Sequence, residues 1–176
     1  VFSIHTYGPS TATPALRATF VRRARAELRD ARAPSRPLWD TEVNYGIKGP
    51  GSRYPDKDIG GTKAAIYVSQ TYLDSVRLGV ARTYWYSWST RTNLLGITMN
   101  TGYPGATAYQ VTHDWLANAL VDCRSRHVRI CRMSTGHAGA FTVPYYATRT
   151  CDARNRCQAV VPGTRMQVGR MPRWFG

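Results

Sequence analysis

Strand-like and helix-like segments alternate over the first two thirds of this sequence, and that alternation most limits what the chain can fold into. Residues 1–7 alternate in side-chain character as a strand does. The pair Thr13-Pro14 then forms a typical helix start, and apolar residues such as Leu16 and Leu28 follow at helical spacing. Strand followed by helix is the repeating unit of folds with a parallel sheet.

Two further strand and helix pairs follow. A strand over 37–42 precedes the Gly- and Pro-rich segment 43–62, which reads as a long functional loop. A helix from about Lys63 is closed by Gly79, a strand covers 80–88, and a third helix covers 108–120. The chain therefore holds three consecutive β/α units, an α/β fold class.

After residue 121 the pattern changes to short strands separated by turn residues. The expected strands cover 127–133, 140–146 and 158–161, without helical periodicity. We therefore predict two domains, a β/α part over 1–122 and a small, β-sandwich-like domain over 123–176. The chain has no run of about 18 apolar residues, so no membrane span is expected.

The net charge of +14 raises the question of nucleic-acid binding. All but three of the 24 basic residues are Arg, and they are spread along the chain instead of forming one stripe with interleaved aromatic residues. A basic surface open to water explains this pattern, so no nucleic-acid partner is predicted. A basic nucleic-acid module remains the alternative, and it would show steeply salt-dependent binding.

All four cysteines lie in the last third, and none has the C-x-x-C spacing of a zinc or redox site. No metal or cofactor is therefore expected. Each of the pairs Cys123/Cys131 and Cys151/Cys157 brackets a short segment that can fold back, which predicts two disulfides and a secreted protein. Four free thiols in a cytosolic protein are the alternative.

Candidate functional side chains follow from where the strands end. The loops at the carboxyl ends of the strands build the active site of a β/α barrel. His5 and Tyr7, Glu42, and the pair Trp85 and Trp88 all come at such ends. A period of two places Leu38, Asp40 and Glu42 on one face, and neighbours of this kind point in parallel, so Asp40 does not serve as a catalytic partner of Glu42.

These residues resemble the clan A glycoside hydrolases, which are retaining enzymes on (β/α)8 barrels. "PLWDTEVNYG" resembles their seventh-strand motif, which implies that Glu42 is the nucleophile. "FSIHTYG" is similar to the sixth-strand segment that lines the sugar site, and "YWYSW" resembles the eighth-strand segment whose Trp stacks on the sugar. The resemblance covers almost the whole chain in the order of the family, including a last helix and a C-terminal β domain. The implied substrate-binding residues are His5, Tyr7, Tyr45, Trp85 and Trp88.

One part of the family pattern is missing. The general acid/base of clan A is a Glu that directly follows an Asn, and this sequence has no such pair. Its other glutamate, Glu27, lies within a helix among arginines. A whole barrel takes about 250 residues, so the resemblance implies that strands one to five are absent and that the missing N-terminal part of the barrel is a partner. Glycoside hydrolysis with retention needs both carboxylates, and Glu42 supplies only one.

Each site residue also has a purely structural interpretation: Glu42 as a carboxylate at a loop start, His5 as a core histidine, and the tryptophans as core packing. The functional rival of an enzyme is a non-catalytic carbohydrate-binding remnant that keeps Tyr7, Tyr45, Trp85 and Trp88 as a stacking platform. The identity of the sugar stays open. Basic loop residues would suit an acidic glycan, and a bias of composition toward Arg accounts for the same residues; they are Arg53, Lys57 and Arg91.

Overall fold

In the computed structural model, side chains are described for residues 1–47, 58–89 and 95–117, and the backbone alone for the strands beyond. The elements of the first part are β1 (Phe2–His5), α1 (Pro14–Asp30), β2 (Leu38–Val43), α2 (Gly61–Arg77), β3 (Val80–Trp85) and α3 (Pro104–Leu116). The predicted alternation of strands and helices is therefore confirmed. Arg53, Lys57 and Arg91 lie outside the described residues.

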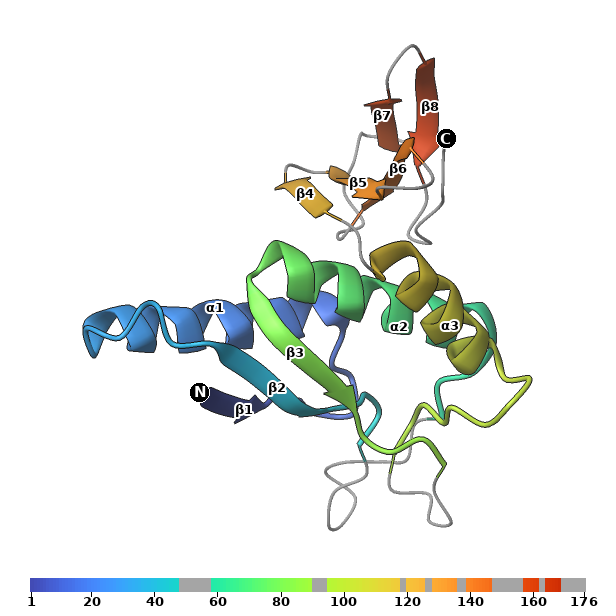
Figure 1. Ribbon diagram of the computed structural model, residues 1–176. Coiled ribbons are helices and arrows are strands. Elements are labelled where there is room, and N and C mark those ends of the chain that lie inside the picture. The colour runs from blue at the N-terminus through green and yellow to red at the C-terminus, as the bar shows by residue number, and fades with distance from the viewer. Residues whose placement is uncertain are drawn as a thin grey trace.

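The three strands form a parallel sheet in the order β1-β2-β3, with α1 connecting β1 to β2 and α2 connecting β2 to β3 (Figure 1). All three strands point the same way, so the loops that follow them lie at one edge of the sheet. In Figure 1 the helices lie together on one side of this sheet. The opposite face of the sheet is the one that a complete barrel turns inward.

Local sequence explains where the helices begin and end. The Thr13 hydroxyl accepts a hydrogen bond of 3.3 Å from the Leu16 amide, so Thr13 is the N-cap of α1, as predicted. Gly79, after the end of α2, has φ of +69°, a conformation that favours glycine. The last helix differs from the prediction, because it begins at Pro104 and ends at Leu116 instead of covering 108–120. Pro at its first turn explains the earlier start.

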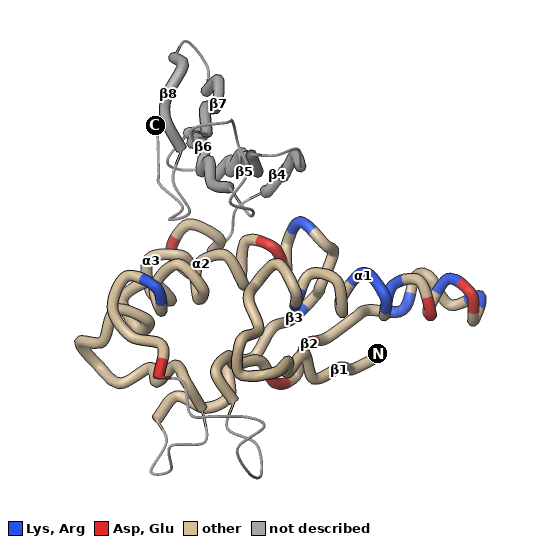
Figure 2. Tube along the Cα trace, turned by 180° about the vertical axis from the view of Figure 1, so that it is seen from behind, with Lys and Arg blue, Asp and Glu red and all other residues tan. Residues whose placement is uncertain are grey.

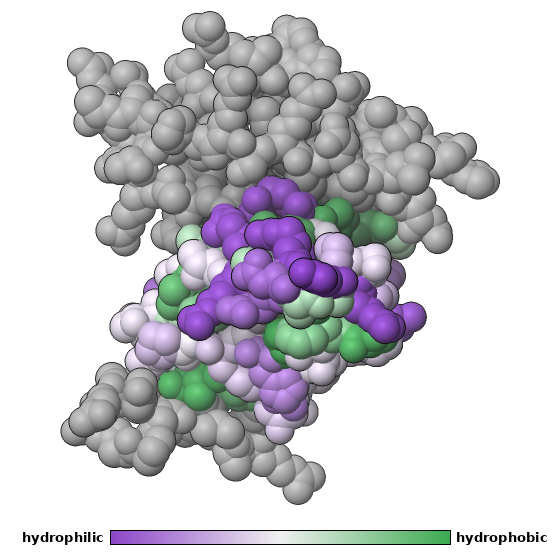
Figure 3. Space-filling model, turned by 90° about the vertical axis from the view of Figure 1, so that its left-hand side faces the viewer, coloured by the Kyte–Doolittle hydropathy of each residue, from purple (hydrophilic) through white to green (hydrophobic). Residues whose placement is uncertain are grey.

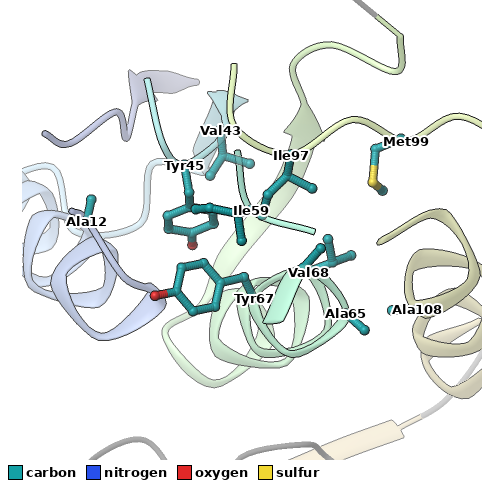
Figure 4. Close-up of a cluster of buried hydrophobic side chains, with 11 residues drawn as sticks. Ala12, Val43, Tyr45, Ile59, Ala65, Tyr67, Val68, Ile97, Met99 and Ala108 are labelled. Atoms are coloured by element: carbon teal, nitrogen blue, oxygen red, sulfur yellow. The ribbon is translucent and has the colours of Figure 1, made fainter. Parts of the chain in front are cut away.

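Two clusters of buried side chains hold the helices to the sheet. Val21 and Leu28 of α1 pack with Leu38 and Val80 of the strands. A second cluster packs the loops after β2 and β3 onto α2 and α3, and Figure 4 shows the rings of Tyr45 and Tyr67 meeting at its centre. Among the described residues, the main hydrophobic core therefore lies between the sheet and the helices.

Five further strands follow α3: β4 (Leu120–Ser125), β5 (Val128–Thr135), β6 (Gly139–Tyr146), β7 (Cys157–Val161) and β8 (Thr164–Val168). The first three form an antiparallel sheet and the last two a hairpin. The change from β/α units to short strands matches the sequence pattern. The predicted domain boundary between residues 122 and 123 falls inside β4. The strands alone do not test a domain boundary, and it stays a prediction. Within the described part, no helix is long and apolar enough to cross a membrane.

Candidate active site

Three side chains meet at the carboxyl ends of β1 and β2. The Tyr7 hydroxyl donates a hydrogen bond of 2.8 Å to Glu42 Oε2, and His5 Nδ1 lies 3.6 Å from the same oxygen. The rings of His5 and Tyr7 contact each other edge to face, with centroids 6.2 Å apart. The Glu42 side chain keeps 33% of its surface exposed, so a ligand can reach it. The structure thus brings together Glu42, His5 and Tyr7.

A register shift in β2 decides which way Glu42 points. Asp40 is fully buried against Arg17 of α1, on the helix side, and Val43 lies in the helix-side core. Glu42 instead meets Tyr7 on the other face, because the pairing with β1 shifts before His5 and the pairing with β3 shifts between Asp40 and Val43. The prediction that Asp40 and Glu42 share a face is therefore wrong. Strict alternation fails where a bulge inserts a residue.

The surroundings of the Tyr7 phenol raise its pKa and keep it protonated, so it remains a hydrogen-bond donor. Burial raises the pKa of Tyr7 well above its usual range, and the hydrogen bond to Glu42 and the charge of that carboxylate raise it further. A phenol with a raised pKa stays protonated over the whole pH range in which proteins work. Tyr7 therefore donates to Glu42 and orients the carboxylate without competing for its charge.

Tyr86 is a further aromatic residue at this site that sequence reasoning did not select. Its ring lies 6.5 Å from the ring of Tyr7, edge to face, and it is 45% exposed. The backbone amide of Tyr86 bonds to Val43 O, which fixes it beside the end of β2. The alternation along "YWYSW" was the available signal, because it placed Tyr86 on the face opposite Trp85.

Two predicted substrate-binding residues lie elsewhere. Tyr45 is 1% exposed and its hydroxyl hydrogen-bonds Thr71 on α2, so it belongs to the core. The prediction that Tyr45 binds substrate is therefore wrong. Trp85 packs against the same cluster, with its ring 6.1 Å from that of Tyr45 (Figure 4 shows the cluster around Tyr45). Both residues face the helix layer because they share the face of Val43, which pairs with Trp85.

Trp88, the remaining predicted platform residue, is 48% exposed and packs edge to face on Tyr109 of α3, with centroids 5.1 Å apart. No ring contact joins it to Tyr7 or Tyr86 within the described residues. The structure therefore does not bring Trp88 to Glu42.

A buried polar network lies behind the site, on the helix side. Arg17 of α1 is 1% exposed, and its Nε and Nη2 donate to Asp40 Oδ2 at 2.8 and 2.6 Å. The Thr6 hydroxyl donates to the same oxygen at 2.5 Å, and Arg17 also donates to Ser75 of α2. Burial raises the pKa of Asp40 above its usual value, against the lowering influence of the Arg17 guanidinium and the Thr6 hydroxyl. The network ties β1, β2, α1 and α2 together next to Tyr7 and Glu42.

Several arginines of the β/α part have individual partners. Besides Arg17, Arg25 donates to Gly79 O, Arg77 pairs with Asp74 at 3.2 Å, and Arg82 lies over the Trp39 ring. Apart from Arg82 on β3, the exposed arginines of the described residues lie on α1 and the turn after it, where Figure 2 shows them and Figure 3 shows hydrophilic patches. They are Arg22, Arg23, Arg29, Arg32 and Arg36. This surface lies on the helix layer, away from the strand ends that carry Glu42.

The cysteine predictions concern residues whose side chains lie outside the described part of the structure. Cys151 is itself not described, and Cys157 begins β7. The backbone pairing of β4 with β5 sets Cys123 directly opposite Cys131.

Comparison with known proteins adds one structural match. A family 39 glycoside hydrolase from the gut symbiont Bacteroides cellulosilyticus WH2 aligns with 98% of this chain and 43% of its own, with a TM-score of 0.59 and 14% sequence identity. This chain therefore spans less than half of that protein. No protein-family model and no curated protein sequence matches. The match establishes the fold, three parallel β/α units that correspond to part of a TIM barrel, so the predicted fold class is confirmed for these units.

Proposed function

We propose that this chain is the nucleophile-bearing part of a retaining glycoside hydrolase, with Glu42 as the nucleophile. One observation carries the proposal: the Tyr7 hydroxyl bonds Glu42 Oε2 at 2.8 Å at the carboxyl ends of two adjacent parallel strands. In β/α barrels that end of the sheet is where catalytic residues gather. The fold likeness to a family 39 glycoside hydrolase supports the barrel architecture on which the proposal depends.

The chemistry assigns a step to each residue. Glu42 Oε attacks the anomeric carbon, a C–O bond to the carboxylate forms, and the glycosidic C–O bond breaks as an acid protonates the departing oxygen. Water then cleaves the glycosyl ester and returns Glu42 to its ionised form. Tyr7 orients the carboxylate during both steps, and His5 and Tyr86 contact the sugar beside it.

The other glutamate of this sequence does not serve as the proton donor of the proposed reaction. Retaining glycosidases hold the two carboxyl groups about 5 to 5.5 Å apart. The second glutamate of the chain, Glu27, has a 64% exposed side chain on α1, where it pairs with Arg23. We therefore propose that the acid/base comes from the preceding strands of the barrel, as part of the same protein or as a separate partner.

The test joins the chain to those preceding strands and measures hydrolysis of activated aryl glycosides. We expect Glu42→Ala to abolish turnover and added azide to restore part of it, because azide can replace the missing nucleophile. Glu27→Ala is the matched control and should keep the activity of the parent. Inversion of anomeric configuration, or full activity without Glu42, would overturn the proposal.

A carbohydrate-binding remnant is the second candidate, and the lack of a second site glutamate in the chain favours it. Both candidates predict sugar binding near Tyr7 and Tyr86, but only the enzyme predicts a covalent intermediate. Mass spectrometry after reaction with a 2-fluoro glycoside separates them, because labelled Glu42 requires nucleophilic attack. We also propose that the protein is secreted, which rests on the predicted disulfides.

A further inference from the structure

A pocket lies at the same edge of the sheet as Glu42 but is built by other residues. It has a volume of about 550 Å³, within the range of ligand-binding pockets. Its walls come from residues 58–60 before α2, from residues 95–103 before α3, and from the first turns of these two helices, which lie side by side (Figure 1). Neither Glu42 nor Tyr7 lines it.

The walls of this pocket are fixed by hydrogen bonds to the segment that follows Glu42. The Gly96 amide donates to Tyr45 O at 2.8 Å, and the Ile59 amide donates to Gly96 O at 2.6 Å. Asn44 bonds both the amide and the carbonyl of Ile97. The pocket is therefore preformed, and its position is set by the same chain segment that carries the nucleophile.

The lining combines an apolar floor with a polar, aromatic rim. Ile59, Ala64 and Leu95 are buried beneath, while Asp58 is exposed at the rim and Tyr103 is 51% exposed. Thr98 and Asn100 also line the pocket. An exposed aromatic ring next to hydrogen-bonding side chains is suited to a ligand with one apolar face and polar edges.

The accessible main chain of two glycines adds hydrogen-bonding groups to the pocket. A Cβ atom at Gly60 or Gly61 would meet nothing within 4 Å, so a ligand has room to approach the main chain there. Neither Gly60 nor Tyr103, the N-caps of α2 and α3, makes a side-chain cap bond. The first-turn amides of α2 can supply donors while Asp58 supplies acceptors, and a hydroxyl group uses both at once.

We propose that this pocket is a second carbohydrate-binding site, which takes a neutral sugar ring stacked on Tyr103 with its hydroxyls bonded to Asp58. The neutral class follows because, among the lining residues that the structure describes, Asp58 alone carries a charge, and its carboxylate repels a uronic acid. The site holds a glycan chain beside Glu42, and it does not require Glu42 to be catalytic.

The test follows protection from hydrogen exchange at residues 58–61 and 103–105 as sugars are titrated into a dilute solution of the chain. The probes are hexasaccharides of β-1,4-linked xylose and of β-1,4-linked glucose, with hexagalacturonate as the acidic comparison. We expect saturable protection with a neutral probe. Tyr103→Ala should weaken it about tenfold, the scale of one aromatic contact, and Tyr103→Phe should retain it.

Three further variants complete the design. Asp58→Asn should also weaken binding, and Tyr84→Ala, which truncates an equally exposed tyrosine outside the pocket, should leave it unchanged. Glu42→Gln should leave it unchanged too, so failure of the proposed catalytic role and failure of this site are separate results. Absence of saturable protection by either neutral probe, protection by hexagalacturonate alone, or full affinity of Tyr103→Ala would overturn the proposal.

Discussion

At the scale of single residues, the hydrogen bond from Tyr7 to Glu42 is the contact on which the site depends. A hydrogen bond to a charged group contributes about 1.5 to 3 kcal/mol, so we expect Tyr7→Phe to lower kcat/KM of the assembled enzyme by about 10- to 100-fold. Steady-state kinetics measure this. Tyr84→Phe is the control, because Tyr84 contacts Trp39 instead of Glu42. Unchanged kinetics in Tyr7→Phe would remove Tyr7 from the mechanism.

The buried pair of Arg17 and Asp40 gives a prediction about stability. Removing one partner of a buried ion pair leaves the other charge unpaired, so Arg17→Met should cost about 3 to 5 kcal/mol of unfolding free energy. Adding Asp40→Leu should recover most of that loss, since an apolar pair of similar volume needs no hydrogen bonds. Urea unfolding of the parent and of both variants measures the difference.

The same variant has a defined pH dependence. The folded pKa of Asp40 is raised, with burial as the largest cause, and losing Arg17 removes an influence that lowers it. A carboxyl with a raised folded pKa contributes stability below its unfolded pKa and loses that contribution as pH rises through the folded value. The penalty of Arg17→Met should therefore be larger at about pH 7 than at about pH 4. An equal penalty at both pH values contradicts this account.

Single residues also mark the limit of what could be predicted from sequence. Glu42, His5 and Tyr7 were selected from strand ends and family resemblance, and the structure brings them together. Arg17 was not selected, because an arginine on an Arg-rich helix looks like surface and nothing local reveals its partner 23 positions away. Tyr45 was misassigned for the opposite reason, because a tyrosine after a strand end gives no sign of the helix that buries it.

At the scale of elements, the N-cap of α1 was predicted correctly, and it allows a direct test. Thr13→Ala removes the side-chain acceptor for the Leu16 amide and should destabilise the protein by about 1 kcal/mol. Thr19→Ala is the matched control, since Thr19 lies exposed inside the same helix and bonds only Leu16 O. Chemical denaturation compares the two. Equal loss in both variants would remove the capping role of Thr13.

Strand faces were less predictable than strand positions. Periodicity located β2 and β3 to within a few residues, yet it assigned Asp40 and Glu42 to one face. The shift in pairing between Asp40 and Val43 arises from contacts with both neighbouring strands, which sequence alternation does not contain. That same shift turns Glu42 away from the core and toward the ligand side.

The β4–β5 hairpin carries the prediction about the thiols. Directly opposite residues of antiparallel strands have Cα atoms about 4.5 to 5.5 Å apart, which a disulfide can span, and Cys123 pairs opposite Cys131. We expect Cys123 to bond Cys131 and Cys151 to bond Cys157. Mass spectrometry of non-reduced peptides identifies the pairs. Four alkylatable thiols in protein purified without reductant would contradict both the pairing and secretion.

At the scale of the whole molecule, the sheet of the β/α part has no partner strand at either edge among the described residues. Its order β1-β2-β3 leaves β1 and β3 as outer strands, and the face opposite the helices exposes Tyr84 and Tyr86. Outer strands with free hydrogen-bonding groups tend to pair with other chains. The basic residues on α1 lie on the covered side of the sheet, so they do not protect these edges.

The isolated 176-residue chain should therefore self-associate and should not hydrolyse glycosides at an enzymatic rate. Self-association follows from the open edges, and it should appear in sedimentation velocity as a mass that rises with protein concentration. Inactivity follows from the proposal that the acid lies in the preceding strands, since general acid catalysis contributes about 10² to 10⁴-fold. Adding the preceding half of the barrel should give a monodisperse, active species, and Glu42→Gln should give the same monodisperse species without activity. Turnover by the isolated chain at the rate of the reassembled enzyme would show that the proton donor lies within its 176 residues. The proposal that the two carboxylates lie in different parts of the barrel would then be wrong.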